Sequence, residues 1–294
     1  MPPEPHRPRE LEYQIFLGSE VVQRGLLTGH QLRSQAWRRI RQNVYADARL
    51  APDHPLACRA VALRAVSGLV IAGPSAASLL GIEHAAAFSD DVHVLAPPDV
   101  RVSAQRGLRV HATAYDHDDL VETGALPHTT VERTAWDVAG WLPPLRAVPI
   151  LDAMLNRGLL AAKDLPAILD RWHRRRGYRK GHLVFGLLDG SAGGPAESWV
   201  RARLRLAGVP RPVLRYPLRL GEAQGAPLTL DVDMAWPERR VAVEYTANRL
   251  TMLRVAGWLA IHAPLARVGR HFPRVLKEVR QALHRRGWRP EERV

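Results

Sequence analysis

Acidic residues in the stretch 228–258, LTLDVDMAWPERRVAVEYTANRLTMLRVAGW, constrain the fold of this chain more than any other feature. The pattern predicts a strand with Asp231 and Asp233, a short turn, a second strand with Glu244, and then a helix. Alternation along a strand places Asp231 and Asp233 on one face. Acids on two paired strands are a common way to hold a hard divalent cation. The stretch therefore predicts a sheet that carries a candidate metal site.

The bulk composition is that of a globular chain without a membrane segment. Hydrophobic residues make up 46% of the chain, which is ordinary for folded domains. A length of 294 residues is enough for two or three small domains. No apolar run approaches the ~20 residues of a membrane span, and the first ten residues lack the apolar core of a secretory signal. The single cysteine, Cys58, excludes an internal disulfide. We therefore expect a cytoplasmic protein that has no membrane partner.

The net charge of +13 at pH 7 suits a polyanionic partner, and nucleic acid is the first candidate. Almost all of the positive charge is arginine, because the only lysines are Lys163, Lys180 and Lys277. A GC-rich genome produces the same bias without any function. The charge therefore indicates nucleic acid only together with signals from the fold.

The N-terminal segment predicts two helices after a short tail. Residues 1–10 are rich in proline and charge and are expected to be disordered. An apolar face with helical spacing runs through residues 11–25. Thr28 is a suitable N-cap for a second helix over residues 28–36.

A basic hairpin is predicted to follow these helices. Residues 37–46, WRRIRQNVYA, alternate on either side of a turn at Asn43, and asparagine tolerates the left-handed conformation that a tight turn needs. Two helices and a basic hairpin are the layout of a winged helix, which we predict over residues 11–52. A hairpin that only caps a small core, or a winged helix that binds protein, stays open as an alternative. The candidate DNA-binding residues are Arg33, Arg38, Arg39 and Arg41.

An α/β region is predicted over residues 53–170, where helical and strand patterns follow one another. It contains no catalytic constellation, because the segment 73–75 lacks the Gly-Lys spacing of a phosphate loop and the histidines lack metal-ligand spacing. Residues 171–196 are first basic and then rich in glycine, which predicts a linker. The remaining residues, 197–294, are predicted to form the last domain.

The last domain is predicted to contain a helix, three strands, a helix, a strand and a terminal helix. Its first helix, over residues 195–209, carries Glu197 in the first turn, where an acid is favourable. We expect Arg201, Arg203 and Arg205 on this helix to face solvent or phosphate. The order helix, three strands, helix, strand is that of the core of the PD-(D/E)xK nuclease superfamily. The chain is thus predicted to be a multi-domain α/β protein with a C-terminal restriction-endonuclease-like domain.

The N-terminal half resembles a known family. The segment RGLLTGHQLRSQAWRRIRQNVYA is similar to the N-terminal domain of AbiEi-type antitoxins, with Asn43 where a glycine usually precedes Val-Tyr. The order of GPSAASLLGI, VHVLAP, GLRVHAT and LPHTTVERTAWDVA resembles the central region of the same proteins. This resemblance implies an autorepressor that binds double-stranded operator DNA and counters a nucleotidyltransferase-like toxin.

The C-terminal part, from about residue 195 to residue 288, resembles the Vsr-like endonuclease-fold domain that actinobacterial proteins often carry behind an AbiEi-like region. The segments AESWVRARLRLAGVPRP, VDMAWPERRVAVEY and LRVAGW carry the resemblance. It implies that Glu197, Asp233 and Glu244 match the catalytic acids of the family. In an active member, these carboxylates would hold Mg²⁺, with Asp233 and Glu244 as its metal ligands.

The chain departs from that family directly after Glu244. Members usually continue Val-Glu-Tyr with Asp-Gly and a loop histidine, whereas this chain has Thr246 and enters a helix, with no lysine nearby to activate water. We interpret the chain as a DNA-binding, AbiEi-antitoxin-like protein with an impaired endonuclease-like domain, acting as an autorepressor or in toxin–antitoxin defence. The alternatives are an active Mg²⁺-dependent DNA endonuclease that hydrolyses phosphodiester bonds, and an antitoxin-type repressor that acts mainly by binding protein.

Overall fold

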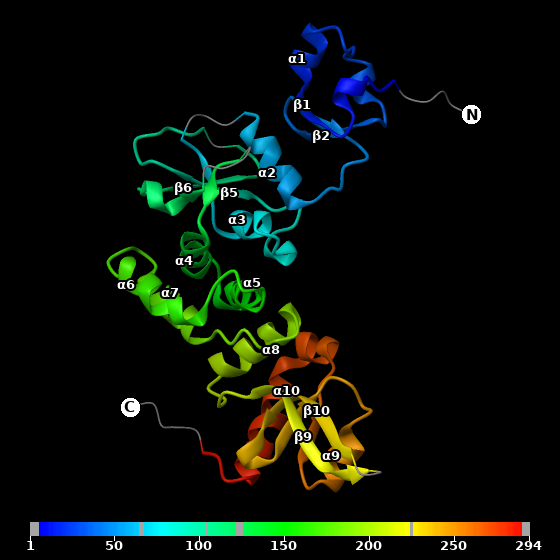
Figure 1. Cartoon of the computed structure of the whole chain (residues 1–294), viewed down its shortest axis with the longest axis vertical. Helices are drawn as coiled ribbons and strands as arrows, with labels where there is room; N and C mark the ends of the chain where they lie inside the picture. The colour runs from blue at the N-terminus through cyan, green and yellow to red at the C-terminus, as the bar shows by residue number, and fades with distance from the viewer. Residues whose placement is uncertain (1–5, 65–67, 104, 122–125, 224–225, 290–294) are drawn as a thin grey trace, which may run out of the picture. The chain divides into compact units, whose positions relative to one another are not determined.

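The computed structural model describes residues 6–64, 68–103, 105–121, 126–223 and 226–289. The chain divides into two compact units, Met1–Trp141 and Leu142–Val294, whose described residues form helices and three sheets (Figure 1). The prediction of a multi-domain α/β protein is confirmed. Among the described residues, no helix combines the length and the apolar character of a membrane span. The tail predicted to be disordered, residues 1–10, lies partly outside the described residues.

The first unit begins with a small antiparallel sheet and short helical turns. Its elements are η1 Arg9–Leu11, β1 Ile15–Leu17, α1 Gly18–Gln23, η2 Gln31–Arg33, β2 Trp37–Arg41 and β3 Val44–Asp47. The strands lie in the order β1-β3-β2. Buried side chains form a small core that includes Leu11, Phe16, Val21, Leu32 and Trp37.

The two helices predicted in this region are largely wrong. Within residues 11–25, strand β1 pairs with β3, and only α1 is an α-helix. Pairing with a strand distant along the chain outweighs the local helical pattern. The second helix, predicted over residues 28–36, is reduced to the single turn η2. Thr28 and Gln31 nevertheless exchange the two hydrogen bonds of a capping box, at 2.7 and 3.2 Å.

The predicted basic hairpin is confirmed. Strands β2 and β3 pair around Asn43, whose φ of 61° lies in the left-handed region. The Asn43 side chain also links the turn to α1: its Oδ1 accepts the Ser19 backbone N–H at 2.9 Å, and its amide donates to the Ser19 hydroxyl at 2.8 Å. The turn therefore uses both the conformational tolerance and the amide group of asparagine.

The rest of the first unit is a five-stranded sheet with its helices. The elements are α2 His54–Ala62, β4 Val70–Ile71, α3 Gly73–Leu79, η3 Glu83–Ala85, β5 Val92–Ala96, β6 Leu108–Ala112, η4 His117–Asp119, β7 Leu120–Val121, β8 His128–Thr129 and α4 Val131–Trp141. The strand order is β6-β5-β4-β8-β7, with parallel and antiparallel pairs. Helix α2 begins after Asp53, whose carboxylate accepts the Leu56 N–H at 2.8 Å.

The second unit begins with helices α5 Pro144–Asn156, η5 Ala162–Asp164, α6 Leu165–Arg171, α7 Tyr178–Gly186 and α8 Pro195–Leu206. The segment 171–196, predicted as a linker, contains α7, which packs against α5 and buries Val184 and Phe185. The linker prediction is therefore wrong for this segment, because α7 has an apolar face to bury. Helix α8 agrees with the predicted amphipathic helix and carries Glu197 in its first turn.

The last part of the second unit is a four-stranded sheet with two helices. Its elements are β9 Val213–Ala223, β10 Ala226–Trp236, η6 Pro237–Arg239, β11 Val241–Glu244, α9 Leu250–Val255, β12 Leu259–His262 and α10 Leu265–Arg285. The order is β12-β11-β10-β9, and β12 runs parallel to β11 at the edge of the sheet. Helix α10 is kinked at His271, two residues before Pro273. Helices α8 and α10 share a core with the sheet that includes Leu204, Met234, Val243, Val268 and Val279.

Candidate functional site

The two acids predicted as metal ligands meet where β10 and β11 pair. The antiparallel register sets Met234 opposite Val243, which brings Asp233 beside Glu244. The backbone N–H of Asp233 donates to Glu244 Oε1 at 3.1 Å, and the backbone N–H of Tyr245 donates to Asp233 Oδ2 at 2.8 Å. The backbone therefore satisfies one oxygen of each carboxylate, and the second oxygen of each remains for a cation.

Arg249 supplies a cation from within the chain. It immediately precedes α9, and its Nη1 lies 3.2 Å from Asp233 Oδ1 and 3.6 Å from Glu244 Oε2. The same nitrogen donates to the backbone carbonyl of Asp231 at 2.6 Å. Arg249 was not among the predicted site residues. The signal for it is an arginine close behind two strand acids that have no lysine beside them.

Burial governs the protonation of Glu244. Its side chain has no exposed surface, and its Oε2 has no hydrogen-bond partner among the described residues. Burial raises the pKa of Glu244 to about 7, and the charge of Asp233 adds to the rise, whereas the Asp233 N–H and Arg249 oppose it. Near neutral pH the Glu244 carboxyl is therefore only partly ionised, and Arg249 is the cation that lies beside it.

Replacing Glu244 by glutamine is expected to remove a pH-dependent cost of folding. The unfolded carboxyl, with its ordinary pKa of 4.5, loses its proton before the folded carboxyl, whose pKa is about 7. The folded state therefore binds the extra proton between these values, and the stability of the wild type falls as the pH rises through this window. Urea unfolding from pH 4.5 to pH 8 is expected to show Glu244→Gln gaining stability over wild type as the pH rises. Two parallel stability curves would contradict this assignment.

The third predicted acid, Glu197, has a different partner. Its Oε2 accepts the backbone N–H of Gly193 at 2.5 Å. Burial raises the pKa of Tyr245, and the negative charge of Glu197 adds to this shift. The side chain of Asp231 is exposed, so that only its carbonyl takes part in the site. Two predicted acids thus converge, while Glu197 is held by a backbone group of the segment that precedes α8.

The site does not fit a Mg²⁺ ion. The part of the chain that the structure describes has no group of three or more His, Cys, Asp or Glu side chains placed to hold a metal. A guanidinium nitrogen also lies next to the free oxygens of Asp233 and Glu244. A divalent cation would have to displace Arg249 from this position and would face its positive charge.

Two of the four predicted DNA-binding arginines are engaged inside the first unit. Arg38 donates from Nη1 to the Leu50 carbonyl at 2.9 Å and from Nη2 to the Ala48 carbonyl at 3.2 Å. Arg41 donates to the backbone carbonyls of residues 106 and 107. These hydrogen bonds fasten the hairpin to neighbouring segments, so we assign Arg38 and Arg41 a positioning role.

The other two arginines, Arg33 and Arg39, are exposed. Arg39 makes one long hydrogen bond of 3.4 Å to the Arg41 carbonyl, and Arg33 has no hydrogen bond or ion pair to any described residue. Both guanidinium groups therefore keep donors available for a ligand.

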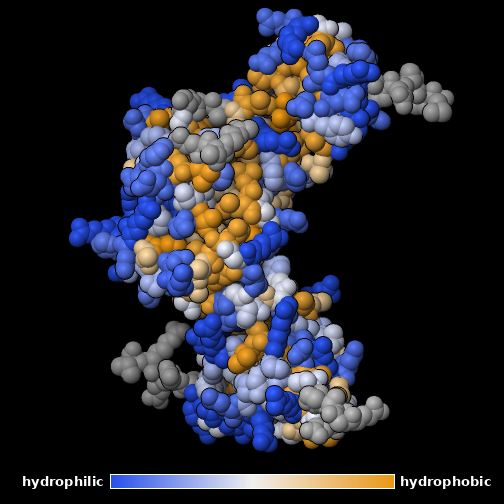
Figure 2. All heavy atoms as spheres, viewed as in Figure 1, coloured by the Kyte–Doolittle hydropathy of each residue, from blue (hydrophilic) through white to orange (hydrophobic). Residues whose placement is uncertain are grey.

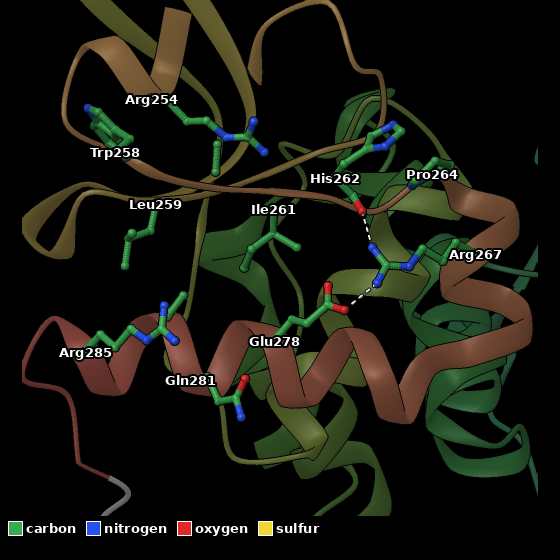
Figure 3. A pocket seen from close by; sticks show the side chains of 12 residues that line it. Arg254, Trp258, Leu259, Ile261, His262, Pro264, Arg267, Glu278, Gln281 and Arg285 are labelled. Atoms are coloured by element: carbon green, nitrogen blue, oxygen red, sulfur yellow. Dashed lines mark hydrogen bonds and ion pairs between the residues drawn. The ribbon is translucent and has the colours of Figure 1, made fainter. Parts of the chain in front are cut away.

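A second basic surface lies in the other unit, beside the edge strand β12. A groove of about 780 Å³ runs between α9 and α10, with Arg254, Arg267, Glu278 and Arg285 among its lining residues (Figure 3). Arg267 is already engaged within the protein: it donates to the His262 carbonyl, and its Nη2 donates to Glu278 Oε1 at 2.5 Å. Arg254 and Arg285 are exposed and have no ion pair to a described residue. The groove therefore offers two free cations, one from each helix.

Comparison with known proteins gives relatives without a described activity. No family model and no solved structure matches the chain. The chain is similar to two proteins of Mycobacterium tuberculosis, Uncharacterized protein MT2308 of strain CDC 1551 / Oshkosh and Uncharacterized protein Rv2248 of strain H37Rv. Each is 32% identical over 154 residues, which cover 52% of this chain and 54% of the relative. The chain thus spans about half the length of the curated relatives it matches.

Proposed function

We propose that this chain binds double-stranded DNA as an AbiEi-antitoxin-like protein and acts as a transcriptional autorepressor or in toxin–antitoxin defence. The observation that carries the proposal is the basic hairpin β2–β3, which joins β1 in the sheet order β1-β3-β2 after η1, α1 and η2; this element order supports a winged helix. Exposed Arg33 and Arg39 on η2 and the hairpin support contact with phosphate. A nucleotidyltransferase-like toxin is a further proposed partner, supported by the AbiEi resemblance.

Phosphate contacts are proposed to supply most of the affinity. Turn η2 is only three residues long, so it presents few side chains to base edges in a groove. The net charge of +13 favours the sequence-independent electrostatic part of binding. A strong decrease of affinity with salt is the expected signature.

The C-terminal sheet is proposed to be a nuclease-like module that binds DNA without cleaving it. Hydrophilic residues make up most of the visible face of the part that carries β9 to β12 (Figure 2). Arg254 and Arg285 in the groove beside β12 supply unpaired positive charge for a phosphate backbone. The cation that Arg249 already supplies to Asp233 and Glu244 supports a role other than catalysis.

The double variant Arg33→Ala, Arg39→Ala is expected to lose two phosphate contacts. Because each contact contributes about 0.9 to the slope of log affinity against log salt, the slope should become shallower by about 2. Affinity near 0.1 M salt is expected to fall by roughly tenfold or more, to a similar extent for different duplex sequences. Fluorescence anisotropy with labelled duplexes between 50 and 300 mM salt measures both quantities.

Arg24→Ala is the matched control for this experiment. Arg24 lies at the end of α1 in the same unit, and it pairs with Glu10 at 3.0 Å. Its removal deletes one exposed charge whose acidic partner already balances it, so a small effect is expected. A flat salt response of the wild type, or equal affinities of double variant and wild type, would count against the DNA-binding proposal.

The rival function, an active endonuclease, has its own decisive assay. Plasmid nicking that depends on Mg²⁺ or Mn²⁺, and that disappears in Asp233→Ala, would overturn the proposal of a non-catalytic module. We expect wild type and Asp233→Ala to leave the plasmid intact alike, because the free oxygens of the acid pair face a guanidinium.

A further inference from the structure

The position of Arg249 Nη1 is that of a cation in an oxygen-lined site. Three oxygens surround it: the Asp231 carbonyl at 2.6 Å, Asp233 Oδ1 at 3.2 Å and Glu244 Oε2 at 3.6 Å. Two carboxylate oxygens and one backbone carbonyl are the oxygen ligands that hard divalent cations prefer. These oxygens come from paired strands, so the sheet holds them in place independently of Arg249.

We propose that the guanidinium of Arg249 is the resident cation of the Asp233–Glu244 pair, and that the pair binds a divalent cation such as Mn²⁺ once Arg249 is replaced by a neutral side chain. The wild-type chain therefore has a latent metal site that its own arginine closes. This inference goes beyond the proposed DNA binding and does not depend on it.

Burial explains why the pair requires a cation. The Glu244 side chain is fully buried, and its Oε2 has no hydrogen-bond donor among the described residues. An ionised carboxylate in such a place is costly unless an opposite charge lies close by. Arg249 is the basic residue that approaches both carboxylates in the described structure. Its removal leaves one oxygen of each carboxyl group without a cation beside it.

Access and geometry also favour exchange of one cation for another. The Arg249 side chain is 35% exposed and that of Asp233 is 20% exposed, so water reaches this side of the pair. A metal ion there would take three protein oxygens and complete its shell with water. The other oxygens of the pair keep their bonds to the N–H groups of Asp233 and Tyr245, which hold both carboxylates in the same orientation.

The test is Mn²⁺ binding by the full-length protein at pH 8, measured by electron paramagnetic resonance of free Mn²⁺ and by the Mn²⁺-dependent shift of Tm. Wild type is expected to show no saturable site at this pair. Arg249→Ala is expected to bind one Mn²⁺ at least tenfold more tightly than wild type, with a Tm that rises with Mn²⁺. Arg249→Lys keeps a positive charge at the position and is expected to behave as wild type.

The double variant Arg249→Ala, Asp233→Asn is the matched control, because it removes one metal ligand and is expected to lose at least tenfold in Mn²⁺ affinity. Circular dichroism checks that each variant is folded. Arg249→Gln, which keeps a donor for the Asp231 carbonyl, replaces Arg249→Ala if the latter does not fold, and the same gain in Mn²⁺ affinity is expected.

A Mn²⁺ site in wild type that Asp233→Asn removes would overturn the inference. A folded neutral variant that binds Mn²⁺ no better than wild type would also overturn it. DNA affinity measured in parallel reports on the proposed function separately.

Discussion

Replacing Arg201 by methionine is expected to lower the free energy of unfolding of the second unit by about 3–5 kcal/mol, because it leaves a buried carboxylate without its cation. Arg201 on α8 is 1% exposed, and its Nη2 donates to Asp152 Oδ2 on α5 at 2.6 Å. Its Nη1 donates to the Leu187 carbonyl. The other carboxylate oxygen of Asp152 accepts the N–H groups of residues 189 and 190. One ion pair thus connects two helices and the turn between α7 and α8.

Urea unfolding followed by circular dichroism measures this loss, and Arg205→Ala serves as its control. Arg205 is on the same helix and half-buried, and it donates to the Val209 carbonyl at 3.0 Å without contacting a buried acid. Its removal is expected to cost about 1 kcal/mol or less. Similar losses for the two variants would show that the Arg201–Asp152 pair has no special role. The structure also corrects the prediction that Arg201 faces solvent or phosphate.

Replacing Arg133 by methionine is the second large expected effect, with a loss of about 3–5 kcal/mol in the first unit. Arg133 on α4 is buried, and its Nη1 donates to Asp119 Oδ2 at 2.6 Å while its Nε donates to Asp137 Oδ1 at 3.0 Å. Both carboxylates are 1% exposed. Removing the guanidinium takes away the cation that two buried carboxyl groups share, one in η4 and one in α4.

Asp137→Asn is the matched control for Arg133, since it keeps the shape of the cluster. Burial raises the pKa of Asp137 to about 7, so this carboxyl already holds its proton in a large fraction of molecules at neutral pH. Its Oδ2 is buried without a hydrogen-bond partner among the described residues. We expect this variant to unfold within about 1 kcal/mol of wild type. A loss as large as that of Arg133→Met would mean that Asp137, rather than Arg133, holds the cluster together.

Local rules account for the parts of the fold that the sequence predicted well. Strands β10 and β11 follow from period-two alternation, and the hairpin follows from asparagine at the turn, where φ is 61°. The capping box of Thr28, which was predicted as an N-cap, depends on a residue three positions further along. In each case the interacting groups are neighbours in the chain, so the spacing of residue types is sufficient.

Tertiary pairing accounts for the parts that the sequence predicted badly. The segment Ile15–Leu17 has helical spacing but becomes a strand, because β3 offers it a partner. Segment 171–196 was predicted as a linker from its charge and glycine content. It nevertheless contains α7, which packs against α5. Arg38 and Arg41 have the appearance of exposed hairpin arginines, but carbonyl groups elsewhere in the first unit accept their hydrogen bonds.

For the candidate site, strand alternation and a short turn were enough to predict Asp233 and Glu244 on neighbouring strands, because they leave few other registers. Which cation faces these two acids depends on how the distant parts of the chain pack together. Arg249 and Asp233 form an ion pair although they are 16 residues apart in the sequence, and Arg201 and Asp152 are 49 residues apart. The sequence shows which charged residues are present. The contribution of each charge to stability depends on its burial and on the partner that folding brings within a few ångströms.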